Sequence, residues 1–262
     1  MEIFRPFPIS YKNFMNMRLK ILLRGKMKSS IMWLPVIQSR YLDPFSFMQS
    51  AEALHELIGD YPRVAIGTVC KCKNLGFIEF CCKYARKVFP HSWIHAFGMT
   101  LTALPRVMQY INSFDSMAWT FPRTPGKSSC KNEQERKEYF YAYLKRVNEV
   151  AGNVRFYTYP PNGCEYPYIL CNRRNYQTLF TKKFEHAILD VGVMDFCNPH
   201  VKDYPPGFME RWKKLAEALT EALKGKIWIV IPDYPDDYNP GQFGCNITKT
   251  LENIKNFINI RG

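Results

Sequence analysis

Short apolar runs alternate with amphipathic stretches along most of the chain. Several runs, such as 226–232 (KIWIVIP), are continuously apolar instead of alternating between apolar and polar residues. A parallel strand that is covered on both faces has this pattern, because neither face meets water. We therefore expect strands in eight segments: 32–37, 63–69, 92–97, 114–119, 154–159, 167–171, 186–193 and 226–232.

The stretches between these runs carry helix signals. Residues 43–60 begin with Asp43 as the expected N-cap and Pro44 at the first helical position, and Gly59 marks the end. Further amphipathic helices are expected at 77–88, 130–152, 205–226 and 246–258. Strands that alternate with helices predict an α/β fold, a single (β/α)₈ barrel, with a doubly wound sheet as the alternative. We assign residues 31–262 to the barrel and residues 1–30 to a basic N-terminal extension.

Composition narrows the class of protein. Apolar residues make up 47% of the 262 residues, which is enough for a sizeable core. The net charge of +13 favours a polyanionic partner, nucleic acid before membrane, and no apolar run approaches the length of about 18 residues that a transmembrane helix needs. Nine cysteines in an irregular pattern indicate a reducing, intracellular and cytoplasmic location.

Three aspartates lie at or beside the expected ends of strands. In a parallel barrel the catalytic groups gather at the carboxyl ends of the strands and in the loops that follow them. The pattern places Asp190 and Asp233 there, and it places Asp115 at the beginning of the expected strand 114–119. One carboxylate of such a set can attack an anomeric carbon, one can move protons, and one can hydrogen-bond a substrate. For any single aspartate, capping of the following helix is the structural alternative.

The strand ends together resemble the tRNA-guanine transglycosylase superfamily, and most closely its branch that inserts 7-deazaguanine bases into DNA. The segments that carry the resemblance are PVIQS, AIGTV, HAFG followed by FDSMAW, ILDVGV and IPDYPDD. The resemblance implies that Asp115 is a covalent nucleophile and Asp190 a general acid/base. It also implies a set of residues that bind the base: Asp233, Gln38, Gly67, His95 and Asp236.

The order of these motifs is rotated relative to the family, which implies a circularly permuted barrel. We therefore expect 226–233 and 32–38 to be neighbouring parallel strands. Val191 and Asp195 depart from the family's pattern, which puts contacts to the base in doubt. The zinc motif and its subdomain are missing, since Leu75 stands where a third cysteine is needed, so we expect no cofactor and keep zinc as an alternative.

The implied activity is that of a glycosyltransferase, which exchanges guanine in a nucleic acid for a 7-deazaguanine-type base. DNA is favoured over tRNA because the appended tRNA-specific domains are absent, and a purine or 7-deazapurine base is the second partner; a homodimer is left open. Basic residues expected to hold the nucleic acid are Arg40, Lys71, Arg123, Lys127, Arg173 and Arg174. A catalytically inactive nucleic-acid-binding barrel and a glycosidase, which also needs paired carboxylates, are the alternatives.

Overall fold

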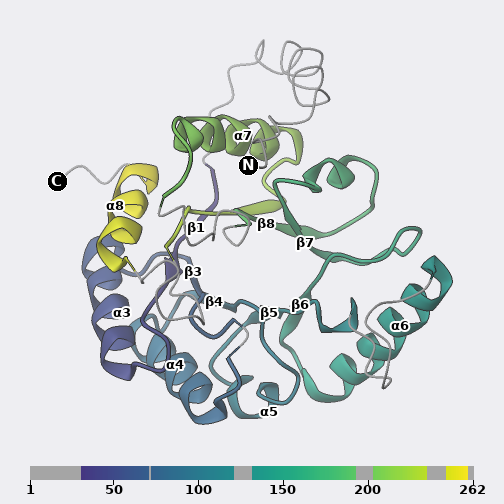
Figure 1. Ribbon diagram of the computed structural model, residues 1–262, viewed down its shortest axis with the longest axis horizontal. Helices are drawn as coiled ribbons and strands as arrows, with labels where there is room; N and C mark the ends of the chain where they lie inside the picture. The colour runs from purple at the N-terminus through teal and green to yellow at the C-terminus, as the bar shows by residue number, and fades with distance from the viewer. Residues whose placement is uncertain (1–30, 71, 121–131, 193–202, 235–245, 259–262) are drawn as a thin grey trace, which may run out of the picture.

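Parallel strands follow one another around a ring, with helices on its outside (Figure 1). The computed structural model describes residues 31–70, 72–120, 132–192, 203–234 and 246–258. Within these ranges the strands form two parallel sheets, in the orders β1-β9-β8-β7 and β2-β3-β4-β5-β6. The strand bounds are β1 Trp33–Leu34, β2 Val36–Ile37, β3 Arg63–Ile66, β4 Trp93–Ala96, β5 Ser113–Asp115, β6 Arg155–Tyr157, β7 Tyr168–Asn172, β8 His186–Asp190 and β9 Ile227–Val230.

The two sheets are joined at both ends. Strands β1 and β2 are one segment interrupted at Pro35, which has no N–H to donate to a ladder; β1 pairs with β9 and β2 pairs with β3. At the other end a parallel bridge links Thr158 to Ile169, and the amide of Leu170 donates to the carbonyl of Thr158 at 3.0 Å. The expected α/β fold with parallel strands is thereby confirmed.

The first and last strands are neighbours, as expected. Trp33 pairs with Ile229 and Leu34 with Val230 in parallel register. Any ring of eight strands brings its first and last strands together, however, so this pairing does not by itself indicate a circular permutation.

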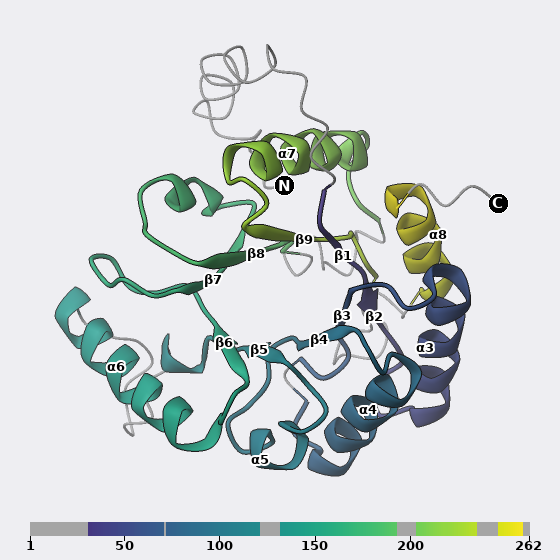
Figure 2. The ribbon, with the colours of Figure 1, turned by 180° about the vertical axis from the view of Figure 1, so that it is seen from behind.

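The helices begin and end largely where the sequence predicts. The side chain of Asp43 accepts from the amide of Ser46 at 2.9 Å and caps the first long helix, and Gly59 ends it at a φ of 59°. Figure 2 shows α3, α4 and α8 side by side along one part of the ring. The helix bounds are α3 Pro44–Ile58, α4 Leu75–Val88, α5 Leu104–Val107, α6 Glu133–Val150, α7 Phe208–Ala222 and α8 Ile247–Ile258.

Strand β5 differs from its predicted bounds. It ends at Asp115, which the sequence placed near the beginning of a strand, and the chain then forms the 3-10 helix η2 (Ala118–Thr120). Trp119 in η2 is buried, and its Nε1 donates to Thr158 Oγ1 at 2.9 Å. The apolar run therefore continues past the strand because Trp119 belongs to the core, not to the sheet.

An ideal (β/α)₈ barrel has an α-helix after each strand, and the connections that follow β6 and β7 lack one. Residues 158–167, which connect β6 to β7, contain no helix. Tyr166 of this segment packs against the barrel wall. Its hydroxyl donates to the carbonyl of Phe156, and its ring contacts Phe140 of α6 edge-on. A second 3-10 helix, η3 (Tyr176–Phe180), follows β7.

No helix in the described ranges is both long and apolar enough to cross a bilayer. The predicted basic extension, residues 1–30, lies outside the described residues.

Arg86 fastens the end of α4 to the strand that follows it. Its guanidinium donates to Asn112 Oδ1 at 2.7 Å, and Asn112 Oδ1 also accepts from the amide of Ile94 in β4. Burial lowers the pKa of Arg86. The same guanidinium donates to four backbone carbonyls, those of Phe89, Pro90, Ser92 and Tyr110.

We expect Arg86→Leu to lower the free energy of unfolding by roughly 2–4 kcal/mol, because several partly buried acceptors lose a charged donor. Urea unfolding followed by circular dichroism measures the change. Arg106→Leu is the matched control, since among the described residues the side chain of Arg106 makes one exposed contact, with Glu79 at 3.6 Å, and such pairs contribute about 0–1 kcal/mol. Equal losses in the two variants would show that Arg86 does not hold the α4–β4 connection.

Candidate active site

Three aspartates occupy the carboxyl-end mouth of the barrel. Asp115 ends β5, Asp190 ends β8, and Asp233 follows β9. Strands β8 and β9 are neighbours, whereas β5 lies in the other sheet, so the carboxylates approach from different parts of the ring. Asp115 and Asp233 are buried, and Asp190 is partly exposed. The charges of Asp233 and Asp115 both act on the titration of Asp190, and the convergence of the three side chains on one cavity stays a prediction.

Asp190 is the carboxyl group that most readily keeps its proton. Loss of hydration by burial is the main cause that raises the pKa of Asp190 to about 7, and the charges of Asp233 and Asp115 raise it further. The backbone amides of Gly192 and Val191 act in the opposite direction by stabilising the anion. Asp190 can therefore donate or accept a proton near neutral pH.

Asp233 is paired with Gln38. The Nε2 of Gln38 donates to Asp233 Oδ2 at 2.5 Å, and both residues are buried. Burial raises the pKa of Asp233 to about 6, although the hydrogen bond from Gln38 lowers it. The Oε1 of Gln38 is buried and accepts no hydrogen bond from the described part of the protein. Tyr204 donates to the carbonyl of Asp233 at 2.8 Å and fixes the backbone there.

Gly67 makes room for Gln38. A Cβ at Gly67 would lie 2.1 Å from Nε2 of Gln38 and 2.6 Å from its Cδ, which is too close for any side chain. The sequence identified Gly67 as a residue whose backbone approaches a substrate. In the structure the space above this glycine is occupied by the Gln38 amide, so its effect on a substrate passes through Gln38.

Asp115 is held through one of its two carboxylate oxygens. The amide of Gly98 donates to Oδ1 of Asp115 at 2.9 Å, and Nε2 of His95 lies 3.4 Å from the same oxygen. Gly98 has a φ of 60°, and a Cβ there would lie 2.5 Å from Sγ of Cys70. His95 is fully buried within β4 and is directed at the carboxylate.

The sequence missed part of this arrangement. Ser113 lies two residues before Asp115 and Trp93 two residues before His95, so strand alternation directs each pair to the same side. Ser113 Oγ contacts Nδ1 of His95 at 2.9 Å and accepts from Nε1 of Trp93 at 2.8 Å. The strand period of two in WIHA and SFD could have predicted that these side chains share one side of the sheet.

Of the basic residues predicted to hold nucleic acid, the structure describes three. Arg40 and Arg174 are exposed, and Arg173 is partly buried. Four further predicted site residues lie outside the described residues: Lys71, Arg123, Lys127 and Asp236. Asp195, which departs from the family's pattern, also lies outside them.

Two arginines at the amino-terminal ends of strands, opposite the aspartates, lie over aromatic rings. The guanidinium of Arg155 lies over the rings of Trp93 at 4.7 Å and Tyr168 at 5.3 Å, and that of Arg63 lies over Trp228 at 5.5 Å. Arg155 is exposed and Arg63 partly buried, so these cation–π contacts are modestly favourable. Part of the excess positive charge therefore serves the fold.

In the described ranges, no group of three or more His, Cys, Asp or Glu side chains is arranged to hold a metal ion. Cys81 and Cys82, in the amphipathic stretch 77–88 where the sequence predicts a helix, are buried in α4. Burial raises the pKa of both thiols well above the ordinary range. The expectation that the protein needs no cofactor stays a prediction.

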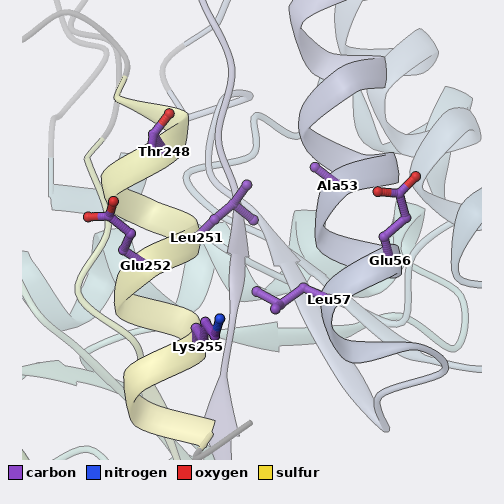
Figure 3. A pocket seen from close by; sticks show the side chains of 7 residues that line it. All are labelled: Ala53, Glu56, Leu57, Thr248, Leu251, Glu252 and Lys255. Carbon is purple, nitrogen blue, oxygen red and sulfur yellow. The ribbon is translucent and has the colours of Figure 1, made fainter. Parts of the chain in front are cut away.

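A groove runs between α3 and α8 on the outer wall of the barrel (Figure 3). It belongs to the helical layer and contains none of the three aspartates, so we do not assign the chemistry to it. The residues that line it are Ala53, Glu56, Leu57, Thr248, Leu251, Glu252 and Lys255.

Comparison with known proteins yields only distant likeness in fold. No family model and no curated protein matches the chain. Among solved structures, a truncated 3-deoxy-D-arabino-heptulosonate 7-phosphate synthase from Thermotoga maritima is 11% identical, with a TM-score of 0.43 over 87% of this chain and 86% of that one. An enolase from Pseudomonas fluorescens is 11% identical, with a TM-score of 0.43 over 83% of this chain and 53% of the other. An HpcH/HpaI aldolase from Desulfitobacterium hafniense is 10% identical, with a TM-score of 0.32 over 93% and 97%.

These findings correct the family resemblance. None of these structures is a tRNA-guanine transglycosylase, and their weak likeness assigns neither an activity nor a substrate to this chain. The predicted family membership, the circular permutation relative to that family, and guanine exchange in DNA or tRNA are therefore not upheld. The predicted nucleic-acid and purine-base partners, and the inactive nucleic-acid-binding barrel, are corrected with them.

Proposed function

We propose that the protein is an enzyme that cleaves a glycosidic bond in a small polar substrate, with carboxylates as its catalytic groups. The observation that carries the proposal is the placement of three aspartates at or just after the carboxyl ends of β5, β8 and β9, on one side of the ring. Burial, together with the charges of the other two, raises the pKa of Asp190 to about 7. Cleavage of a glycosidic bond needs a proton-bearing carboxyl and a second, anionic carboxylate in the same pocket. A pair of this kind matches the glycosidase alternative that the sequence left open.

Asp190 is the proposed general acid/base. At neutral pH a substantial fraction of a carboxyl group with a pKa of about 7 carries its proton, and it can give that proton to a leaving group. An aspartate in water, with a pKa near 4, is almost entirely ionised at this pH and cannot do so efficiently.

Asp115 is the proposed nucleophile. The contacts from Gly98 and His95 both fall on Oδ1, which orients the carboxylate and leaves Oδ2 to attack the anomeric carbon. A carboxylate positioned in advance avoids the entropic cost of orienting itself during the reaction.

The proposed reaction has two steps. Oδ2 of Asp115 bonds to the anomeric carbon while the bond to the leaving group breaks, and the leaving atom takes the proton of Asp190. In the second step a water molecule gives a proton to Asp190 and attacks the same carbon, and the bond to Asp115 breaks. Both carboxyl groups end in their starting states.

Gln38 and Asp233 are proposed to bind the substrate. The free Oε1 of Gln38 can accept a hydrogen bond, and Asp233 can accept or, when protonated, donate one. A substrate with neighbouring N–H or O–H groups would satisfy both, and a buried acceptor without such a donor is costly.

Six described cysteines are free thiols, which supports the proposal that the protein works in a reducing, cytoplasmic compartment.

We expect Asp115→Asn to abolish turnover, because a neutral amide cannot act as the nucleophile. Release of the leaving group from a panel of aryl glycosides and nucleosides measures turnover, and intact-protein mass spectrometry with 2-fluoro sugar substrates detects the covalent adduct. Asp60→Asn is the control, since Asp60 is exposed and contacts only His55 among the described residues. An adduct of undiminished yield in Asp115→Asn would remove Asp115 from the nucleophilic role.

We expect Asp190→Asn to be inactive and yet to gain stability relative to the wild type as the pH rises. A carboxyl whose folded pKa is raised contributes stability that is present below its unfolded pKa of 3.8 and is lost as the pH rises through about 7. Asparagine has no such loss, so the difference in the free energy of unfolding should shift in favour of the variant by roughly 2 kcal/mol between pH 5 and pH 8.

Urea unfolding at both pH values measures the shift, and Asp43→Asn is the control because asparagine replaces the N-cap acceptor there. In the wild type, kcat/KM should fall above about pH 7 as Asp190 ionises. An Asp190 carbon signal that titrates near pH 4 in the nuclear magnetic resonance spectrum would contradict the proposed acid.

We expect Gly67→Ala to displace Gln38, to raise the pKa of Asp233 further and to lower the free energy of unfolding by roughly 1–3 kcal/mol, through overpacking. Carboxyl titration by nuclear magnetic resonance and urea unfolding measure the two effects. Gly76→Ala is the matched control, because its Cβ would meet nothing closer than 3.5 Å and alanine favours the helix. An unchanged Asp233 titration in Gly67→Ala would separate Gln38 from Asp233.

A further inference from the structure

A buried chain of hydrogen-bonding groups leads from Trp93 to the carboxylate of Asp115. Trp93 Nε1 lies 2.8 Å from Ser113 Oγ, and Ser113 Oγ lies 2.9 Å from Nδ1 of His95. On the other side of the imidazole, Nε2 lies 3.4 Å from Asp115 Oδ1. Ser113 and His95 are both inaccessible to solvent.

We propose that Trp93 and Ser113 are positioning residues that fix the tautomer of His95, so that its Nε2 carries a hydrogen directed at Asp115. The importance of this for catalysis rests on the proposed role of Asp115 as the nucleophile. The tautomer itself follows from the count of donors and acceptors along the chain.

The count begins at Trp93. An indole N–H is only a donor, so the oxygen of Ser113 must be the acceptor in that contact. The hydroxyl of Ser113 has one hydrogen of its own, and Nδ1 of His95 is its partner at 2.9 Å. With Nδ1 as the acceptor, a neutral imidazole carries its hydrogen on Nε2. Each contact from Trp93 to Nδ1 then has one donor and one acceptor, and the hydrogen on Nε2 faces Oδ1 of Asp115 at 3.4 Å.

The other neutral tautomer, with the hydrogen on Nδ1, fits these contacts less well. If Nδ1 carried the hydrogen, Ser113 would accept two hydrogen bonds and its own hydrogen would have no acceptor in this contact chain. The lone pair of Nε2 would also face the oxygen of Asp115, which is repulsive when the carboxylate is ionised. The ring is kept from turning by Phe97 and Tyr157, whose centroids lie 4.6 Å and 5.6 Å away, each edge-on to the imidazole.

The fixed tautomer places two donors on one oxygen of Asp115. The amide of Gly98 contacts Oδ1 at 2.9 Å, and the hydrogen of His95 Nε2 faces the same atom. The distance of 3.4 Å is longer than a formed hydrogen bond, and catalytic contacts of this length tighten when substrate binds. Because both donors stabilise charge on Oδ1, the attack by Oδ2 occurs from a carboxylate that has one orientation.

The tautomer can be measured without any substrate. Long-range ¹⁵N–¹H nuclear magnetic resonance spectra of protein labelled at histidine nitrogen distinguish the two neutral tautomers and the imidazolium, and His95→Gln identifies the His95 signals. We expect the wild type to have the Nε2–H form. Ser113→Ala should convert His95 to the Nδ1–H form or to an exchanging mixture, and Trp93→Phe should produce a smaller shift in the same direction. Ser113→Thr, which keeps the hydroxyl, should retain the wild-type form.

Ser92→Ala is the matched control. Ser92 is also a buried serine, beside the same strand, but its hydroxyl donates to the carbonyl of Tyr61 and does not contact His95. Its His95 signals should match those of the wild type. A wild-type His95 in the Nδ1–H or imidazolium form, or an unchanged Nε2–H form in folded Ser113→Ala, would overturn the proposal.

The kinetic effect is a second measurement. Ser113→Ala should lower kcat by about fivefold to tenfold with KM little changed, because the energy of one buried hydrogen bond is lost in the orientation of the nucleophile. Ser113→Thr should restore kcat. If the tautomer is as expected but no glycosidic bond is cleaved by the wild type, the proposed function fails while the assignment of His95 stands.

Discussion

Loss of hydration at the barrel mouth is the constraint on which the rest of this structure depends. Burial raises the pKa of Asp190 and of Asp233, and the charges of Asp233 and Asp115 raise that of Asp190 further. Gln38 donates to Asp233, and Asp115 receives its contacts from Gly98 and His95. The barrel takes the three carboxylates from different strand ends, so each has its own partners.

Much of this fold could be predicted from the sequence, because its local signals are strong. Continuous apolar runs identified the strands, and Asp43 with Gly59 marked a helix correctly. The absence of a helix before β7 agrees with the sequence, in which Pro160, Pro161 and Gly163 stand between the expected strands 154–159 and 167–171. The packing of Tyr166 in this connection could not be predicted, because no local pattern reports it. At the site, the placement of the three aspartates beside strand ends could also be predicted from the apolar runs. The space above Gly67 depends on the rotamer of Gln38, which only the packed structure fixes.

The family resemblance failed for a physical reason. Parallel barrels direct small and polar residues to the carboxyl ends of their strands whatever reaction they catalyse, so Gly, Gln and Asp at successive strand ends describe the architecture before they describe a function. The neighbouring first and last strands are likewise a property of any closed ring. The net charge of +13 was a similar case, because Arg63, Arg86 and Arg155 bind rings or carbonyls within the fold.

The interior of the barrel is therefore layered by chemistry along its axis. At the amino-terminal ends of the strands, the exposed guanidinium of Arg155 lies over the ring of Trp93. The indole N–H of Trp93 then leads through Ser113 and His95 to Asp115 at the opposite end. A residue that fills the bottom of the barrel thus also sets the hydrogen position on the imidazole beside the mouth. Because the strands alternate with a period of two, Trp93 and His95 share a face with one residue between them, and the link needs no residue outside β4 and β5. The same packing that stabilises the barrel thereby orients a carboxylate at its site.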